Sequence, residues 1–514
     1  MQAKVLSNAI WNAINGSSSA VVAVLVPPFL TRLLTPEAYG AWALALQIGT
    51  YVSLFGFGIQ MAVGRYVAYH EAREDYAARD GIVATAFWFL ACASVIGWLA
   101  ICGVALTIEW LVPNLAPELV GQTRWAIVLV GLALAINLPS SVFAAVFTGM
   151  QKSDVPAKIQ GLGRLALALG LVIAGLSRNL GVLGLVYAII SIGTVAGLAY
   201  AWRTRTHAPE LSIGYVAKKH VSELASFCFS LTIWNFAMLL ISGLDLLIVG
   251  RYDYAATPYY AVSASLAAVI NGILGSLANA LVPPIAKSYA EGAHEDAMHT
   301  VESASRFILS IAVVASSIFI FCARDVADLW LGKSYGYQSS EIIMVLATAT
   351  LIRSILTPYV SAAIATGGHR SIAWTPIIEG IANVSLSVWL GSMYGLAGIL
   401  TAKVVSAFVG IGLVLYVNPL RNVFDNYDIV VYIRSALYRP LAAILIISLI
   451  VIPADYAQID RNMGGVLYIL LVLSVSSIAC FFVALDSADR KLVIQQMNEL
   501  RSRGSKMMRH FGGM

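Results

Sequence analysis

Apolar stretches long enough to cross a lipid bilayer recur along the whole chain of 514 residues. A transmembrane helix needs about 20 mostly apolar residues, and only helices or closed barrels satisfy the backbone inside lipid. The pattern therefore predicts an all-α polytopic membrane protein with 14 transmembrane helices. They are expected at residues 9–31, 41–63, 82–108, 124–148, 159–176, 182–202, 224–250, 259–285, 303–322, 341–366, 372–393, 395–417, 436–453 and 465–484. Hydrophobic residues make up 59% of the chain and charged residues 11%, which excludes an ordinary soluble domain.

Lysine and arginine gather in alternate loops. The loops after even-numbered spans, together with both ends of the chain, carry many more of them than the remaining loops. The positive-inside rule then places both termini in the cytoplasm. The first span follows Lys4 as a signal peptide would, but its apolar stretch is too long, so it is expected to be retained.

Cysteine and histidine give no sign of a metal site. The 5 cysteines lie in or beside apolar spans without a C-x-x-C motif, and the 7 histidines show no H-E-x-x-H or similar spacing. Neither a disulfide framework nor a metal centre is therefore expected. We expect no cofactor.

The chain also resembles itself at a distance of about 220 residues. EWL at 109–111 has a counterpart in LWL at 329–331, and GVLGL at 181–185 has one in GLAGI at 395–399. Equivalent spans are six apart, so the two halves have the same orientation and form a parallel repeat. Two such bundles can enclose a central cavity, although an old duplication that serves only structure remains the alternative.

The repeat divides the chain into two lobes with additions. We predict an N-terminal lobe of helices 1–6, a cytoplasmic linker, a C-terminal lobe of helices 7–12, helices 13–14 as two extra C-terminal helices, and a basic cytoplasmic tail. The boundaries are 1–205, 206–223, 224–417, 418–485 and 486–514. The tail is expected to form a short basic helix on an anionic leaflet.

Five ionisable residues fall inside predicted spans. Each costs about 2.5–3.5 kcal/mol at a helix centre, so each needs a reason to be there. They are Arg164, Asp245, Arg353, Glu379 and Lys403. Arg353 and Lys403 lie deepest, and Glu379 shares a helix face with Asn383, four residues further on.

Structural explanations compete with functional ones for these residues. Arg164 is near enough to the end of its span for its charged group to reach the membrane surface. Asp245 is near enough to the end of its span to make a polar contact there. Arg353, Lys403 and Glu379 could instead form buried ion pairs that fasten helices together. If the deep cations line a cavity, they favour an anionic substrate, of which phosphate is the obvious kind.

One motif resembles a known transporter family. TRLLTPEAYG at 31–40 carries an R-x-L-x-P-x-x-Y-G spacing, and LWLGKSYG at 329–336 looks like a second family segment. The spacing consists of Arg32, Leu34, Pro36, Tyr39 and Gly40. With the predicted spans, these segments resemble the polysaccharide transporter family, the lipid-linked oligosaccharide flippases of the multidrug/oligosaccharidyl-lipid/polysaccharide exporter superfamily. The resemblance covers about residues 5–485.

The resemblance implies a V-shaped pair of six-helix lobes in a bacterial inner membrane. It implies a flippase that moves undecaprenyl-diphosphate-linked oligosaccharide by alternating access, for O-antigen, capsule or exopolysaccharide synthesis. Cations in a cavity would hold the diphosphate, and Arg353, Lys403 and Arg164 are the candidates here. Transport in the superfamily is expected to be driven by a proton or sodium gradient. Asp245 and Glu379 are the acidic residues that lie deep enough in the spans to couple transport to that gradient. A polysaccharide polymerase is a possible partner, and nucleic acid is not.

Other functions stay open. A multidrug antiporter of the same superfamily normally has twelve spans and an acid in its N-terminal lobe, whereas spans 1–6 here hold no deep Asp or Glu. A peptidoglycan-precursor flippase carries arginines well inside its first helix, whereas this span has only Arg32 at its end. A membrane glycosyltransferase or polymerase is a remote alternative, since no large external loop with paired acids is present. A scaffold would leave the deep cations unexplained.

Overall fold

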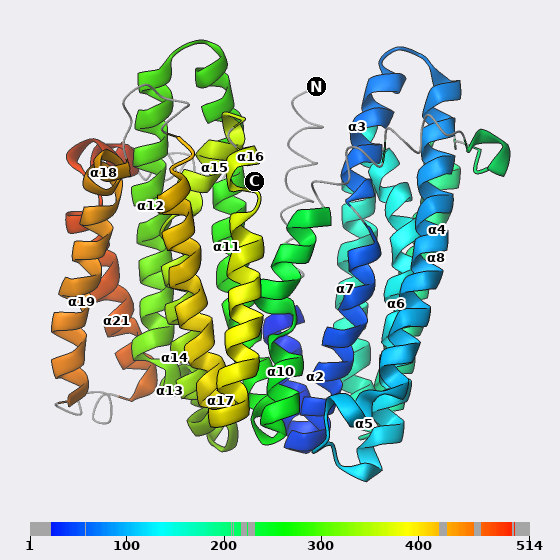
Figure 1. Cartoon of the computed structure of the whole chain (residues 1–514), viewed down its shortest axis with the longest axis horizontal. Coiled ribbons are helices and arrows are strands. Elements are labelled where there is room, and N and C mark those ends of the chain that lie inside the picture. Colours follow the sequence, from blue (N-terminus) through cyan, green and yellow to red (C-terminus); the bar gives the residue numbers. More distant parts are fainter. Residues whose placement is uncertain are drawn as a thin grey trace, which may run out of the picture. The chain divides into compact units, whose positions relative to one another are not determined.

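The computed structural model describes residues 22–56, 58–206, 208, 210–216, 224, 232–367, 369–420, 429–456, 464–495 and 498. All regular structure in these ranges is helical (Figure 1). The chain divides into two compact units, which we call unit 1 and unit 2. Unit 1 comprises Met1–Leu266 with Pro376–Ser406, and unit 2 comprises Ala267–Thr375 with Ala407–Met514.

Unit 1 begins, in its described part, with the short apolar helix Val22–Leu33. Its further elements are α2 (Pro36–Thr50), η1 (Tyr51–Gly56), α3 (Ile59–Glu71), α4 (Tyr76–Leu106), α5 (Ile108–Leu111), α6 (Pro117–Gly149), α7 (Asp154–Gly175), α8 (Leu180–Arg205), η2 (Ile213–Tyr215), the π-helical η3 (Leu239–Gly243), α10 (Asp245–Tyr252) and η4 (Tyr254–Ala256). The first part of α11 (Thr257–Ala290) and most of α17 (Thr375–Val417) also belong to this unit.

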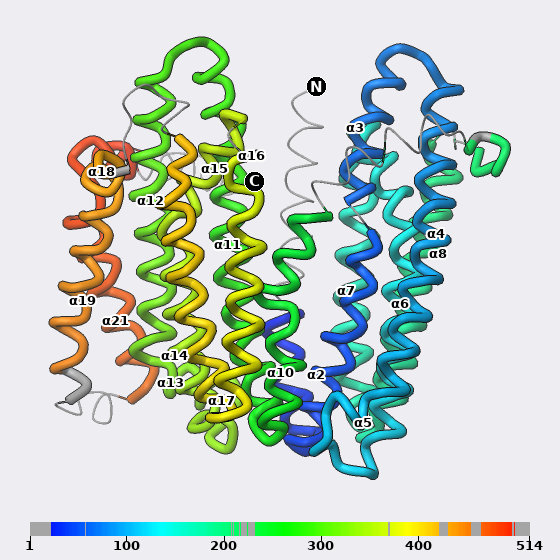
Figure 2. Tube along the Cα trace, in the orientation of Figure 1, coloured from blue at the N-terminus to red at the C-terminus, as the bar shows by residue number. Residues whose placement is uncertain are grey.

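Unit 2 contains the remainder of α11 and of α17. Its other elements are α12 (His294–Phe321), α13 (Ala323–Leu331), α14 (Lys333–Ser354), α15 (Thr357–Ala365), α16 (His369–Ile372), α18 (Ile429–Tyr432), η5 (Ile433–Leu437), α19 (Tyr438–Tyr456), α21 (Gly465–Ala479) and η6 (Cys480–Ala484). Figure 2 traces the same path along the Cα atoms.

Thr-Pro pairs begin several of the helices. Proline suits a first helical turn because its fixed φ is helical and its missing N–H would have no partner there. The pairs are Thr35-Pro36 at α2, Thr257-Pro258 at α11, Thr357-Pro358 at α15 and Thr375-Pro376 at α17. At α2 the Thr35 hydroxyl also accepts a hydrogen bond from the Ala38 N–H at 3.3 Å, which caps the helix.

The 43 residues of α17 form a helical hairpin rather than one straight rod. Gly395 has φ 57° and ψ −135°, values that only glycine adopts readily, and the chain reverses there. The Ser406 hydroxyl then donates to the Asn383 side-chain oxygen at 3.1 Å across the two arms. Figures 1 and 2 show the arms side by side, in yellow and gold. The turn lies between two of the predicted spans, and the sequence placed the break correctly.

Twelve helices in the described residues are long and apolar enough to cross a membrane. The range Thr375–Val417 counts as one of them, although it contains the turn at Gly395. Val22–Leu33 overlaps the predicted first span, whose earlier residues lie outside the described ranges. The chain is therefore a multi-pass, all-helical membrane protein, and the total of fourteen spans stays a prediction.

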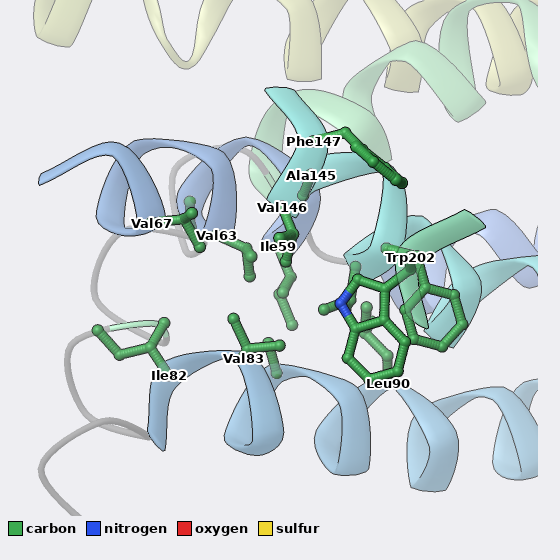
Figure 3. Close-up of a cluster of buried hydrophobic side chains, with 14 of the residues drawn as sticks. Ile59, Val63, Val67, Ile82, Val83, Leu90, Ala145, Val146, Phe147 and Trp202 are labelled. Atoms are coloured by element: carbon green, nitrogen blue, oxygen red, sulfur yellow. The ribbon is translucent and has the colours of Figure 1, made fainter. Parts of the chain in front are cut away.

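A buried apolar cluster holds one end of unit 1 together (Figure 3). It joins α3, α4, α6 and α8, and the Phe143 and Trp202 rings lie 4.8 Å apart at its centre. Its labelled members are Ile59, Val63, Val67, Ile82, Val83, Leu90, Ala145, Val146, Phe147 and Trp202. Because burying each large apolar side chain contributes about 1.5–3 kcal/mol, these four helices pack as one body.

Candidate functional site: a buried polar cluster on α10 and α17

Asp245 is the first residue of α10 and is only 3% exposed. The segment before it, Leu239–Gly243, is π-helical. A π-helical turn departs from the i→i−4 ladder, so its carbonyls can accept bonds from side chains instead. Such turns are frequent at functional sites. A buried carboxylate directly after one is therefore the natural centre of a candidate site.

Lys403, on the second arm of α17, forms an ion pair with Asp245. The side chains of Lys403 and Asp245 are 12% and 4% exposed, so both charges are shielded from solvent. The Lys403 ammonium also donates to the Ile241 carbonyl of the π-helical segment. A buried ion pair, which the sequence left open for Lys403, is therefore present.

Two neutral side chains complete the environment of Asp245. Asn383, on the first arm of α17, donates from Nδ2 to Asp245 Oδ1 at 2.9 Å and to the Ile241 carbonyl at 3.1 Å. The Tyr260 hydroxyl, from α11, donates to Asp245 Oδ2 at 3.2 Å. Both carboxylate oxygens are thus hydrogen-bonded, as a buried charge requires. The cluster is close to neutral overall.

Helix α2 and η1, which follows it, contact the same π-helical segment. Gln47 Nε2 of α2 and the Tyr51 hydroxyl of η1 both donate to the Gly243 carbonyl, each at 2.8 Å. The carbonyls of this one short segment therefore bind side chains from α2, from η1 and from both arms of α17. A change in the charge of Asp245 or Lys403 would act on all of these elements at once.

The other predicted site residues lie on α17, α14 and α7. Glu379 is one turn before Asn383 on α17 and is 8% exposed. Arg353 is half-buried near the C-terminal end of α14, in unit 2. Arg164 is half-buried on α7 and interacts electrostatically with Tyr187 of α8. Of the five predicted residues, the structure joins Asp245 and Lys403 in one contact.

The residues of the family-like motif build a corner between helices. Arg32 is exposed, Pro36 begins α2 and Tyr39 is buried. Gly40 lies against the start of α11, where an added Cβ would be 3.1 Å from Pro258 Cδ. The motif therefore has a packing role, since an added side chain at Gly40 would fit only if Pro258 shifted by a few tenths of an ångström.

Sequence reasoning missed a second charged cluster, in unit 2. Arg306, on α12, binds Asp489 at 2.5 Å and Asp486 at 3.0 Å, and its guanidinium also donates to the Ser435 carbonyl at 3.0 Å. The Ser303 hydroxyl donates to Asp489 as well. Arg306 stands where a polar segment meets an apolar span, and a solvated charge is the ordinary expectation there. No local pattern indicates acids 180 residues away.

The Asp489 carboxyl makes one contribution to stability dependent on pH. Burial raises the pKa of Asp489, but hydrogen bonds from Arg306 and Ser303 outweigh this effect and lower the pKa below its ordinary 3.8. A lowered folded-state pKa gives stability that is present above the unfolded value and is lost as pH falls through the folded one. We expect the thermal midpoint of the purified protein to fall steeply below about pH 4, and less steeply in Asp489→Asn. If the thermal midpoints of the wild type and of Asp489→Asn fell equally steeply with decreasing pH, the prediction would be wrong.

In the part of the chain that the structure describes, His, Cys, Asp and Glu side chains form no group of three or more placed to hold a metal. The cluster at Asp245 instead combines one carboxylate, one ammonium and an amide. Such a set can exchange a proton or bind an ion, but it offers no nucleophile with an adjacent base.

Comparisons with known proteins show the family of the chain. A family model described as "Polysaccharide biosynthesis protein" matches residues 29–341. A putative O-antigen transporter from Shigella flexneri is 22% identical over 407 residues, covering 77% of this chain and 93% of the relative.

Solved structures match the fold. A lipid II flippase in an inward closed conformation has a TM-score of 0.70 at 12% identity, over 93% of this chain and 97% of that one. An inward-facing multidrug resistance transporter has a TM-score of 0.59 at 14% identity, over 81% and 96% of the two chains. These likenesses show that the chain shares the fold of these two structures.

Proposed function

Because the chain belongs to the polysaccharide biosynthesis protein family, we propose that it is a flippase for undecaprenyl-diphosphate-linked oligosaccharide repeat units. The family match over residues 29–341 is the observation that carries the proposal. The protein would lie in a bacterial inner membrane with both termini in the cytoplasm, and would deliver repeat units for a cell-surface polysaccharide. The twelve apolar helices of the described chain suit a substrate whose lipid tail stays in the bilayer.

The roles proposed for the buried charges follow from electrostatics. Arg353, Lys403 and Arg164 would contact the diphosphate, because cations bind phosphate oxygens through short charge-assisted hydrogen bonds. Lys403 is paired with Asp245 in this structure, so a bound anion would compete with that carboxylate for the ammonium.

The same exchange offers a means of coupling. A diphosphate that draws Lys403 away leaves Asp245 with a buried negative charge, which a proton or sodium ion would then compensate. Binding of the anion and of the cation would therefore favour each other by thermodynamic linkage. Glu379, buried on the same arm as Asn383, is the second carboxylate proposed for this coupling.

The function is tested by leaflet translocation in vesicles that contain the purified protein. A lipid-diphosphate-linked oligosaccharide in the inner leaflet should become accessible to a membrane-impermeant lectin outside. If instead the protein moves only peptidoglycan precursor, or expels cationic dyes, the family placement stands and the substrate assignment fails. Glycosyl transfer without translocation would make it an enzyme.

Glu379→Gln is expected to lower gradient-driven translocation at least several-fold while leaving folding intact. The substitution keeps the size and hydrogen-bonding capacity of a side chain that is 8% exposed, but it cannot change charge. Glu341→Gln, the same change at an exposed position of α14, is the matched control. Equal rates for the two variants under an imposed proton or sodium gradient would remove Glu379 from the coupling.

A further inference from the structure

Helix α2 and helix α10 lie side by side in unit 1 and make a continuous seam (Figure 1). Helix α2 comes from the first half of the sequence repeat, and α10 from the second. At one end the Tyr254 hydroxyl donates to the Glu37 carbonyl at 2.7 Å. Further along, Leu44 fills the space over Gly250, where an added Cβ would lie 3.1 Å from Leu44 Cδ1.

The seam is closed by polar contacts at both of its ends. At its outer end Arg251 donates to the Trp110 carbonyl at 2.7 Å, and its guanidinium lies 5.0 Å from the centre of the Trp110 ring. Trp110 is the central residue of the repeated EWL segment. At the inner end Gln47 and Tyr51 share the Gly243 carbonyl.

The position of the seam suggests its role. Arg251 falls on the side of the membrane that the positive-inside rule places away from the cytoplasm. A transporter built from two repeats alternates by opening one end of the interface between them while the other end is closed. Every contact of the seam joins the two repeats at this one end.

We propose that the α2–α10 seam is the extracytoplasmic gate of the transporter, and that Gln47, Tyr51 and the Gly243 carbonyl form its inner latch. The proposal rests on the proposed transport function. The latch lies on the segment whose Ile241 carbonyl binds Lys403, and Asp245 begins the next helix. Gate closure is therefore connected through one short segment to the ion pair that would exchange its partners during transport.

Two cysteine pairs of equal geometry test the gate. A Cβ on Gly40 would lie 3.4 Å from the Cβ of Thr257, the first residue of α11, next to the Tyr254–Glu37 end of the seam. A Cβ on Gly49 would lie 3.4 Å from the Val130 Cβ, between α2 and α6 within the first repeat. Both separations are close to the range of about 3.5–4.5 Å found in disulfides, and Val130→Cys removes the γ-methyl group that would crowd Gly49.

The pairs are introduced after replacement of the native cysteines, and a membrane-permeable oxidant is added to vesicles. We expect the Gly40→Cys/Thr257→Cys bridge to lower the translocation rate at least tenfold, and we expect the rate to recover when the disulfide is reduced. The Gly49→Cys/Val130→Cys bridge should leave the rate within about twofold, because α2 and α6 move together. Translocation that continues through the first bridge overturns the gate, as does equal loss with both bridges or failure of the first bridge to form.

A second measurement needs no substrate, so it separates failure of the gate from failure of the proposed function. Leu44→Cys places a buried thiol inside the seam. Adding Gln47→Leu and Tyr51→Phe removes both donors to Gly243, and labelling by an impermeant maleimide from outside should become about 5- to 100-fold faster. Tyr200→Phe, at an exposed tyrosine, should leave the labelling rate unchanged. Unchanged labelling in the latch variant would overturn the latch.

Discussion

Lys403→Met is expected to destabilise the protein by about 3–5 kcal/mol and to abolish translocation, because it leaves Asp245 buried without its cation. Methionine keeps the length of the lysine stem, so the loss is mainly electrostatic. Thermal unfolding of the detergent-solubilised protein measures the first effect, and the vesicle assay measures the second.

Asp245→Asn combined with Lys403→Met provides the control. A pair made neutral on both sides lacks the uncompensated charge, so the double variant should regain most of the lost stability. Translocation should stay absent, since neither the proposed anion contact nor the proposed coupling carboxylate is present. If the double variant transports like the wild type, the ion pair is a structural fastener. If it is as unstable as the single variant, the electrostatic explanation is wrong.

Arg353→Ala is expected to reduce translocation about 10- to 100-fold. A hydrogen bond to a charged group contributes about 1.5–3 kcal/mol, and the proposed contact to the diphosphate has this character. The side chain is half-buried on α14, and no part of its proposed role concerns folding. Initial rates over a range of lipid concentrations would show whether apparent affinity is lost.

Two further substitutions separate charge from geometry at this position. Arg353→Lys keeps the charge but not the planar fork that binds phosphate through two bonds, so an intermediate rate is expected. Arg324→Ala removes an exposed arginine from α13 of the same unit and should leave translocation unchanged. Full activity of Arg353→Ala would remove Arg353 from the substrate site.

The membrane character of the fold could be predicted from the sequence, because each span is indicated by its own local run of apolar residues. The break at Gly395 could be placed for the same reason, because it lies where two apolar runs meet. The π-helical turn at Leu239–Gly243 could not be placed, since the sequence LLISG carries no pattern that distinguishes a π-helical turn from an α-helical one.

Two residues of the candidate site, Asp245 and Lys403, could be singled out from the sequence, but their contact could not. The cost of burying Asp245 and Lys403 marks each of them, whereas their pairing depends on how α10 packs against α17, 158 residues later. Arg306 could not be singled out in this way, because it lies at the edge of a span, where a charged residue costs little. For the motif at residues 31–40, the family resemblance was correct, while the corner that it builds became visible only in three dimensions.

The separation of Asp245 and Lys403 along the chain has a consequence for biogenesis. At synthesis rates of about 5–20 residues per second, the nascent protein carries Asp245 for roughly 8–30 s before Lys403 emerges from the ribosome. Until then Tyr260 can act as an early neighbour of the carboxyl group. The ion pair can form only when the second arm of the hairpin docks, and a chain truncated before Lys403 would keep Asp245 in the bilayer without its cation.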